Sequence, residues 1–268
     1  MVKVIKLGGS ILKTGFPHNF ILDLKNVLQT EKIIFVHGGA ALVTSTAEMM
    51  NRQQKFVVSP DGMKSRYTDK ETMDIFTMVM AGKINKHVVA SLESYGIKAI
   101  GICGVDGHLL KAKRKEKLII VDEKGKKMII DGGYTGKISE VNVPLLQELL
   151  NLGLLPVVAP IAMDNAFELL NVDSDRAAAY IAGAIKAESL IFCTDVPGVI
   201  LNETTVDKMT VEEAKMNLNR IGHGMKKKIY ASIEALEMGL KESVITSGLL
   251  KTPITSALKH EGGTLIAP

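Results

Sequence analysis

A lysine and two glycines near the N-terminus have the types and spacing of a phosphate-binding site. Lys6 lies in the apolar, β-branched run Val2–Leu7, and Gly8 and Gly9 follow that run directly. An unpaired ammonium group is costly to bury, so a lysine in such a strand needs a partner or a task. Glycine N–H groups approach an anion closely because no Cβ stands in the way. The stretch fits either a phosphate held by Lys6 and the two amides or a surface lysine at a strand end.

Strands and helices alternate along the chain, and glycines stand at several strand ends. The strand Ile33–Val36 runs into Gly38 and Gly39, and a helical pattern follows. A helix that begins behind glycines favours an anionic group at its N-terminus. The long helical stretch 70–95 leads into another apolar strand at 97–103. This order predicts a mostly parallel sheet covered by helices, with ligands at the carboxyl ends of the strands.

The second half of the chain repeats this alternation. A helical pattern covers 176–185, a strand covers 189–193, and another helix opens near Gly224. No low-complexity linker separates the two halves. We therefore expect two lobes of one fold, an N-terminal lobe at 1–170 that carries the hairpin described next and a C-terminal lobe at 171–268.

Positive charge is concentrated in one segment. The stretch Lys111–Met128 holds eight lysines and arginines and three acidic residues, whereas the formal net charge of the whole chain is +4. Within it, 118–121 and 128–130 are apolar and flank a turn at Lys124-Gly125, which predicts a protruding β-hairpin. Such a hairpin is either an ordinary solvated surface or a docking surface for an acidic partner.

Several classes of protein fit this sequence poorly. No apolar run approaches the roughly 20 residues that a membrane-spanning helix needs, and the start lacks the apolar core of a signal peptide, so we expect a cytoplasmic protein. Cys103 and Cys193 both lie in apolar runs, which predicts buried, reduced thiols. The absence of tryptophan and the few other aromatic residues argue against nucleic-acid binding by base stacking.

Seven short motifs, taken in order, carry a resemblance to a known family. They are Lys6-Leu-Gly-Gly9, His37-Gly-Gly39, Arg66-Tyr-Thr68, Gly101-Ile-Cys-Gly104-Val-Asp106-Gly107, Asn171-Val-Asp173-Ser-Asp175, Thr194-Asp-Val-Pro-Gly198 and Gly224-Met-Lys-Lys-Lys228. On these motifs the sequence resembles the amino acid kinase family, and within it the acetylglutamate kinase branch. The resemblance implies a three-layer α/β/α sandwich that binds the phosphoryl acceptor in the N-terminal lobe and ATP in the C-terminal lobe.

The resemblance also implies a reaction, the ATP-dependent phosphorylation of a side-chain carboxylate to an acyl phosphate. Such a transfer relies on positioning and on cations that stabilise dispersed negative charge. Lys6 and Lys228 match the family's two catalytic lysines, and the spacing after Gly224 selects Lys228 over its neighbours, of which only one is expected to face the site. Asp175 matches the carboxylate that orients both lysines; its alternative role is that of a helix N-cap.

Binding residues are implied in the same way. Gly8, Gly9 and Gly39 would line the phosphoryl path with amides. Gly39 and Ala40 would border the acceptor pocket, where Arg66 and Asn171 match acceptor-binding positions. Mg²⁺ should arrive with ATP, held by phosphates and water more than by the protein's own side chains. The positions that match the nucleotide side are Thr194, Asp195, Gly198, Val199, Gly224 and Met225.

Three departures from the family pattern concern the acceptor. Ala40 replaces the last residue of a glycine triplet, Asp173 replaces an asparagine, and Lys137 stands where acetylglutamate kinases tend to carry an acidic residue. In carrying Gly136-Lys137-Ile138 at this place, the sequence is similar to the archaeal and Thermus-type lysine-biosynthesis kinases. In those enzymes an acidic amino-group carrier protein caps the amino group of 2-aminoadipate or glutamate. A basic surface suits such a partner, and the residues we expect to dock it are Lys113, Arg114, Lys115 and Lys137.

Alternatives remain at this point. One is the plain N-acetyl-L-glutamate kinase of arginine biosynthesis, and another is a nucleotide or amino acid sensor without turnover. A sensor has no need to keep Lys6, Asp175 and Lys228 together, which argues against it. The resemblance further suggests a homodimer formed through the N-terminal lobe.

Overall fold

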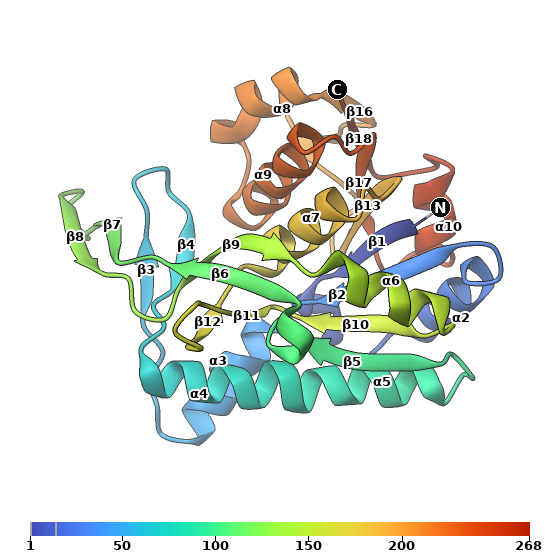
Figure 1. The fold of residues 1–268 in the computed structure, drawn as a ribbon. Helices are drawn as coiled ribbons and strands as arrows, with labels where there is room; N and C mark the ends of the chain where they lie inside the picture. The colour runs from blue at the N-terminus through green and yellow to red at the C-terminus, as the bar shows by residue number, and fades with distance from the viewer. Residues whose placement is uncertain (1, 14) are drawn as a thin grey trace.

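The strand that precedes the first glycines lies at the centre of the fold. The computed structural model describes residues 2–13 and 15–268, and in it β1 (Val2–Leu7) pairs in parallel with β2 (Lys32–His37) and β13 (Ser189–Thr194) (Figure 1). Both faces of β1 are covered by hydrophobic layers, with Val4 in one layer and Ile5 and Leu7 in the other, which explains the nearly continuous apolar run of this strand.

The central sheet has eight strands in the order β16-β18-β17-β13-β1-β2-β10-β5. All neighbours pair in parallel except β17 and β18, so the predicted mainly parallel sheet is confirmed. The strands not yet delimited are β5 (Ala99–Cys103), β10 (Leu155–Ala159), β16 (Lys208–Thr210), β17 (Glu242–Ser247) and β18 (Thr264–Ala267).

Two hydrophobic layers cover the two faces of this sheet. Alternate side chains of β1 enter different layers, Val4 on one face and Ile5 and Leu7 on the other. The first face is covered by α6 (Val143–Asn151), α7 (Ser174–Ala184), α8 (Val211–Asn217) and α9 (His223–Glu237), and the second by α2 (His18–Val27), α3 (Ala40–Met49), α4 (Lys70–Thr77), α5 (Asn85–Glu93) and α10 (Pro253–Leu258) (Figure 1). The expected three-layer α/β/α sandwich is confirmed.

The long helix predicted at 70–95 is present in three consecutive parts. Seven π-helical residues, Met78–Ile84, separate α4 from α5. Such a stretch inside an α-helix often marks a functional region, because it rotates the side chains that follow. Met80 and Ile84 of this part are buried and face Gly39, where an added Cβ would lie 2.1 Å from Ile84 Cδ1. A side chain at position 39 would therefore displace the ends of the buried Ile84 and Met80 side chains.

A second, four-stranded sheet flanks the central one in the order β12-β11-β6-β9. It consists of β6 (Leu110–Arg114), β9 (Gly136–Val141), β11 (Ile161–Met163) and β12 (Leu169–Asn171). The glycines in 132–138 predict a loop from the sequence, and this prediction is wrong for the last three residues, which begin β9. Those residues pair with β6, which is distant in the sequence, and the local sequence alone did not reveal that pairing.

Two β-hairpins project from the body of the molecule (Figure 1). One joins β3 (Phe56–Val58) to β4 (Lys64–Arg66). The other joins β7 (Lys117–Val121) to β8 (Lys127–Asp131) and confirms the predicted basic hairpin. Gly125 in its turn has a φ of 79°, a conformation that favours glycine. The short elements α1 (Gly9–Leu12), β14 (Ile200–Leu201) and β15 (Thr204–Thr205) complete the fold.

The two expected lobes share one continuous sheet. The strands that precede residue 170 form one half of it and those that follow form the other, and β1 and β13 join them. Helix α7 of the second half packs on β1 and β2 of the first. The boundary near residue 170 stays a prediction. Cys103 and Cys193 are buried free thiols, as expected.

Within the described residues, none of the helices has the length and apolar character needed to cross a membrane.

Candidate active site

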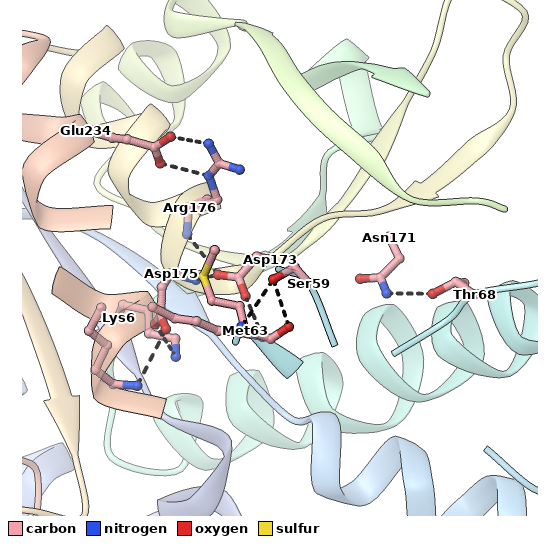
Figure 2. A network of polar contacts seen from close by, with 11 residues as sticks. Lys6, Ser59, Met63, Thr68, Asn171, Asp173, Asp175, Arg176 and Glu234 are labelled. Atoms are coloured by element: carbon pink, nitrogen blue, oxygen red, sulfur yellow. Dashed lines mark hydrogen bonds and ion pairs between the residues drawn. The ribbon is translucent and has the colours of Figure 1, made fainter. Parts of the chain in front are cut away.

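A carboxylate held between two lysines forms the centre of the site. The Lys6 Nζ atom lies 2.6 Å from Asp175 Oδ1, and the Lys228 Nζ atom lies 3.5 Å from Asp175 Oδ2 (Figure 2). Lys6 is on β1, Asp175 is in the first turn of α7, and Lys228 is in the second turn of α9. Lys6 and Asp175 are only 4% and 5% exposed. The fold thus brings together three groups that are up to 222 residues apart in the sequence.

The charges of this cluster leave an excess of one positive charge. Burial by itself raises the pKa of Asp175, but the neighbouring Lys6 and Lys228 outweigh that effect and hold the pKa at about 2. Burial lowers the pKa of Lys6, and the charge of Asp175 opposes this shift. A buried site with one ionised carboxylate and two ammonium groups attracts an additional anion, such as a phosphoryl group.

Asp173, and not Asp175, is the N-cap of α7. Its Oδ1 accepts hydrogen bonds of 2.9 Å from the amide of Asp175 and 3.2 Å from that of Arg176. This arrangement leaves the Asp175 carboxylate free to face the lysines and rules out the alternative role considered for it. Asparagine and aspartate cap helices about equally well, so Asp173 keeps the local structure that an asparagine would give.

Four glycines at the ends of β1 and β2 pack against one another beside this cluster. A Cβ on Gly9 would lie 2.5 Å from the Gly39 nitrogen, and one on Gly38 would lie 2.9 Å from the Gly9 nitrogen. The amide of Gly8 donates to the carbonyl of Cys193 at 2.8 Å, so it is not a free donor. Gly9 lies in the first turn of α1 and Gly39 is the N-cap of α3, where backbone N–H groups lack helical partners. Gly9 and Gly39 are therefore the amides best placed for an anion.

A cavity of about 470 Å³ contains most of the predicted site. Predicted residues that line it are Lys6, Gly8, Gly9, Gly39, Ala40, Arg66, Asn171, Asp175, Gly224 and Lys228. Those absent from its lining are Thr194, Asp195, Gly198, Val199 and Met225, together with the four basic residues expected to dock a carrier. Lining residues that sequence reasoning did not select include Phe56, Lys64, Ser65, Met80, Asp173 and Lys227.

One wall of the cavity is built around Arg66, at the end of β4. Its guanidinium donates 2.8 Å hydrogen bonds to the Ala40 carbonyl and to Thr44 Oγ1, bonds the side chain of Gln54, and lies 5.0 Å from the ring centre of Phe56. Burial lowers the pKa of Arg66 to about 10, so the group stays positively charged at neutral pH. These contacts hold a planar cation rigidly at the cavity wall, which suits the binding of a carboxylate.

Asn171 lies at the end of β12, where its side chain contacts the Arg66-Tyr-Thr68 motif. Its Nδ2 donates a 2.9 Å hydrogen bond to Thr68 Oγ1 (Figure 2). The Asn171 amide also donates to the carbonyl of Tyr134 at 2.8 Å. These bonds connect two motifs that stand about a hundred residues apart and position both at the same cavity.

Comparison with known proteins identifies the family. The model of the amino acid kinase family matches residues 1–247. This chain belongs to the amino acid kinase family. The seven-motif resemblance is thereby confirmed.

Individual members of the family are similar over almost the whole length of the chain. A protein of Nitrosopumilus maritimus named putative [LysW]-aminoadipate/[LysW]-glutamate kinase is 50% identical over 262 residues, 98% of both chains. The [LysW]-aminoadipate/[LysW]-glutamate kinase of Sulfolobus acidocaldarius is 43% identical over 261 residues, 97% of this chain and 98% of its own. A carbamate kinase of Giardia has the same fold, with a TM-score of 0.69 at 14% identity over 99% of this chain and 98% of its own.

In this amino acid kinase, the three consecutive lysines of α9 have three different partners. Lys228 faces Asp175, Lys227 Nζ lies 3.6 Å from Asp173 Oδ2, and Lys226 donates to the backbone carbonyl of Asp61 at 2.8 Å. Successive helical residues point about 100° apart, which gives the three side chains different directions. The prediction that only one of them faces the site was wrong, because Lys227 also lines the cavity. The sequence signal for a second lysine at the cavity was Asp173, whose negative charge replaces the neutral asparagine of the family pattern.

Four of the six residues that match the family's nucleotide side lie at the end of β13 or just after it, and the other two, Gly224 and Met225, lie in the first turn of α9. Thr194 ends that strand, next to Gly8, which follows β1, and its hydroxyl donates to Asp195 Oδ1 at 3.0 Å. Val199 is fully buried, and its amide donates to Thr264 Oγ1 at 2.8 Å. A Cβ on Gly198 would lie 2.7 Å from the same hydroxyl oxygen. Packing thus accounts for Gly198 and Val199, and their contact with a nucleotide stays a prediction.

The four basic residues expected at a docking surface lie on β6, β9 and the segment after β6. Lys113 stands opposite Lys137 in the β6–β9 ladder, and both are exposed. Arg114 donates to the Gly133 carbonyl at 2.7 Å and to Asp131 Oδ1 at 2.8 Å, so it stabilises the loop before β9. Lys115 is half-buried.

Metal ligands are sparse in the described part of the chain, where no group of three His, Cys, Asp or Glu side chains is arranged to hold a metal ion. Asp175 is already neutralised by lysines. This donor set fits an ion such as Mg²⁺ that is bound mainly by phosphate and water oxygens.

Proposed function

We propose that this chain transfers the γ-phosphoryl group of ATP to the side-chain carboxylate of L-2-aminoadipate or L-glutamate whose amino group is linked to an acidic carrier protein. The observation that carries the proposal is the Lys6–Asp175–Lys228 cluster, in one cavity with Arg66. The names of relatives that are 43–50% identical over nearly the whole chain support the choice of acceptor. The product is an acyl phosphate for lysine or arginine biosynthesis.

The residues act mainly by positioning and by electrostatic stabilisation. An oxygen of the acceptor carboxylate forms a bond to the γ-phosphorus while the bond from that phosphorus to the β,γ-bridging oxygen breaks, and ADP leaves. The carboxylate is ionised at neutral pH, so no general base is required. Lys6 and Lys228 stabilise the negative charge spread over the transferring group, and Asp175 holds the two lysines apart and oriented. The amides of Gly9 and Gly39 add donors on the same path.

The two substrates would enter from opposite sides of this cluster. Arg66 would bind a carboxylate of the acceptor, with Asn171 beside it. ATP would lie toward Gly224 and the Thr194–Val199 loop, and bound Mg²⁺ would neutralise its phosphates. The exposed pair Lys113 and Lys137 adds positive charge for an acidic carrier and would speed its encounter. A cytoplasmic location and a homodimer complete the proposal.

A coupled assay of ADP release tests this function. Purified protein with ATP and Mg²⁺ is given free N-acetyl-L-glutamate, carrier-linked glutamate or carrier-linked 2-aminoadipate. We expect turnover of the carrier-linked forms and little of the free one. Brisk turnover of N-acetyl-L-glutamate alone would contradict the proposal. We expect both carrier-linked acceptors to be turned over, since one methylene is worth only about 1–3 kcal/mol of discrimination.

A further inference from the structure

A second, smaller cavity lies directly beside the active-site cavity. It has a volume of about 70 Å³ and is lined by Lys115, Thr135 and Lys137 on one side and by Arg176 on the other. Val172 and Asp173 line both cavities, so they form the wall between the two. A group bound in the small cavity would therefore lie close to an acceptor bound in the large one.

Two of the cations at this cavity have no counter-ion. Arg176 is paired with Glu234 through two hydrogen bonds (Figure 2). The Asp173 oxygen that does not cap α7, Oδ2, lies 3.6 Å from Lys227 Nζ. Lys115 and Lys137, in contrast, have no ion pair within residues 2–13 and 15–268. Burial lowers the pKa of Lys115, the positive charges of Arg176 and Lys137 lower it further, and the charges of Asp173 and Glu234 oppose these shifts only in part. The cavity thus has a surplus of positive charge that an anion would relieve.

A buried hydroxyl at the same cavity also lacks a partner. Thr135 Oγ1 is buried without a hydrogen bond to any described residue. The Thr135 carbonyl accepts a 2.8 Å hydrogen bond from the Lys115 amide, which fixes the residue beside Lys115. A buried hydroxyl without a partner costs roughly 1–3 kcal/mol, so such groups are usually satisfied by water or a ligand.

We propose that this cavity is a carboxylate subsite, in which Lys115, Lys137 and the Thr135 hydroxyl bind a carboxylate of the carrier protein close to its link with the acceptor. The cavity has room for a small polar group, because its volume of about 70 Å³ exceeds the roughly 10–15 Å³ that a single water needs. The subsite rests on the proposed function for the identity of its ligand. Of the four basic residues expected to dock the carrier, only Lys115 and Lys137 belong to this subsite, because Lys113 and Arg114 lie outside the cavity.

Steady-state kinetics with carrier-linked 2-aminoadipate tests the subsite. We expect Lys137→Met to raise KM about tenfold and Thr135→Val to raise it about threefold, with kcat within about twofold of wild type. Thr135→Val should leave Tm unchanged or raise it, because it removes a hydroxyl that has no partner in the described structure. The matched control is Lys259→Met, which removes an exposed lysine at the end of α10.

A KM for Lys137→Met that equals the control's would overturn the subsite and leave the kinase function standing. A comparison with free N-acetyl-2-aminoadipate shows which molecule supplies the bound carboxylate. If Lys137→Met raises KM for the carrier-linked acceptor alone, the carboxylate belongs to the carrier. An equal effect on both acceptors assigns it to the acceptor and overturns the carrier's part.

Crystals soaked in sodium bromide test the same site without any turnover. Anomalous scattering should place a bromide beside Lys115, Lys137 and Thr135 in the wild type and not in Lys137→Met. A wild-type crystal without this bromide would overturn the subsite. If the wild type turns over none of the carrier-linked acceptors, the proposed function fails and the bromide result alone decides whether an anion binds here.

Discussion

Lys226 of α9 donates a 2.8 Å hydrogen bond to the backbone carbonyl of Asp61, at the tip of the β3–β4 hairpin. The lysine is only 6% exposed, although it belongs to a run of three lysines. The hairpin carries Arg66 and the helix carries Lys228, and both line the main cavity. This single contact therefore joins the hairpin that carries Arg66, the proposed acceptor-binding residue, to the helix that carries Lys228, a proposed catalytic lysine.

We expect Lys226→Met to weaken acceptor binding more than catalysis. Loss of a hydrogen bond from a charged donor costs about 1.5–3 kcal/mol, and here it would release the hairpin tip. KM for the acceptor should rise about tenfold or more, while KM for ATP should change little. The measurement is a pair of initial-rate series in which each substrate is varied in turn. Equal changes in the two KM values would count against a specific role of the hairpin.

Removal of either catalytic lysine should lower kcat strongly. We expect Lys6→Met and Lys228→Met each to reduce kcat by about 10²–10³, the usual effect of losing one donor to a transition-state charge. The effects should not add in the double variant, because both lysines act through Asp175. Single-turnover rates with saturating ATP provide the measurement, and Lys259→Met is again the control. A Lys6→Met protein with the wild-type rate would refute the mechanism.

Two neighbouring aspartates should respond differently to the same substitution. Asp175→Asn leaves Lys6 buried without its counter-charge, and breaking a buried ion pair costs about 3–5 kcal/mol. Asp173→Asn keeps the helix cap, so the free energy of unfolding should change by less than about 1 kcal/mol. Urea unfolding of the two variants at neutral pH compares them. Equal losses of stability would show that Asp175 contributes no more than a cap.

The folded state should lose stability in mildly acidic solution because of His37. Its ring is fully buried, with Nδ1 3.1 Å from the Gly38 carbonyl and Nε2 3.2 Å from Asn85 Nδ2, which suits a neutral ring that donates from Nδ1 and accepts at Nε2. Burial lowers the pKa of His37 to about 4. Below about pH 6.5 His37 binds a proton in the unfolded chain but not in the folded chain, so the free energy of unfolding falls as the pH drops from about 6.5 to about 4.

Urea unfolding at pH 7 and pH 5 tests this linkage. The free energy of unfolding of the wild type should fall by about 2 kcal/mol between the two values. His37→Asn should show a smaller fall over this range, whatever its stability at pH 7. A wild type and a variant with the same pH dependence would exclude His37 as the cause.

The sequence by itself determined the architecture and the central charges. The apolar run of β1 and the glycines behind it are local signals, because strand propensity and backbone freedom depend on the residues themselves. The periodic helix patterns and the turn at Lys124-Gly125 of the basic hairpin are equally local. Lys6, Asp175, Lys228 and Arg66 were selected by motif, and the fold places all four at one cavity.

Tertiary structure alone decided which donors and charges are available. The amide of Gly8 is occupied by Cys193, and the role of each lysine from 226 to 228 depends on a partner distant in the chain. The strand β9 exists because β6 lies beside it. The unpaired hydroxyl of Thr135 likewise became visible only in the folded chain. Hydrogen bonds and ion pairs between remote segments depend on distances that only the folded chain sets. Helix and strand patterns, in contrast, depend on the order of neighbouring residues in the sequence.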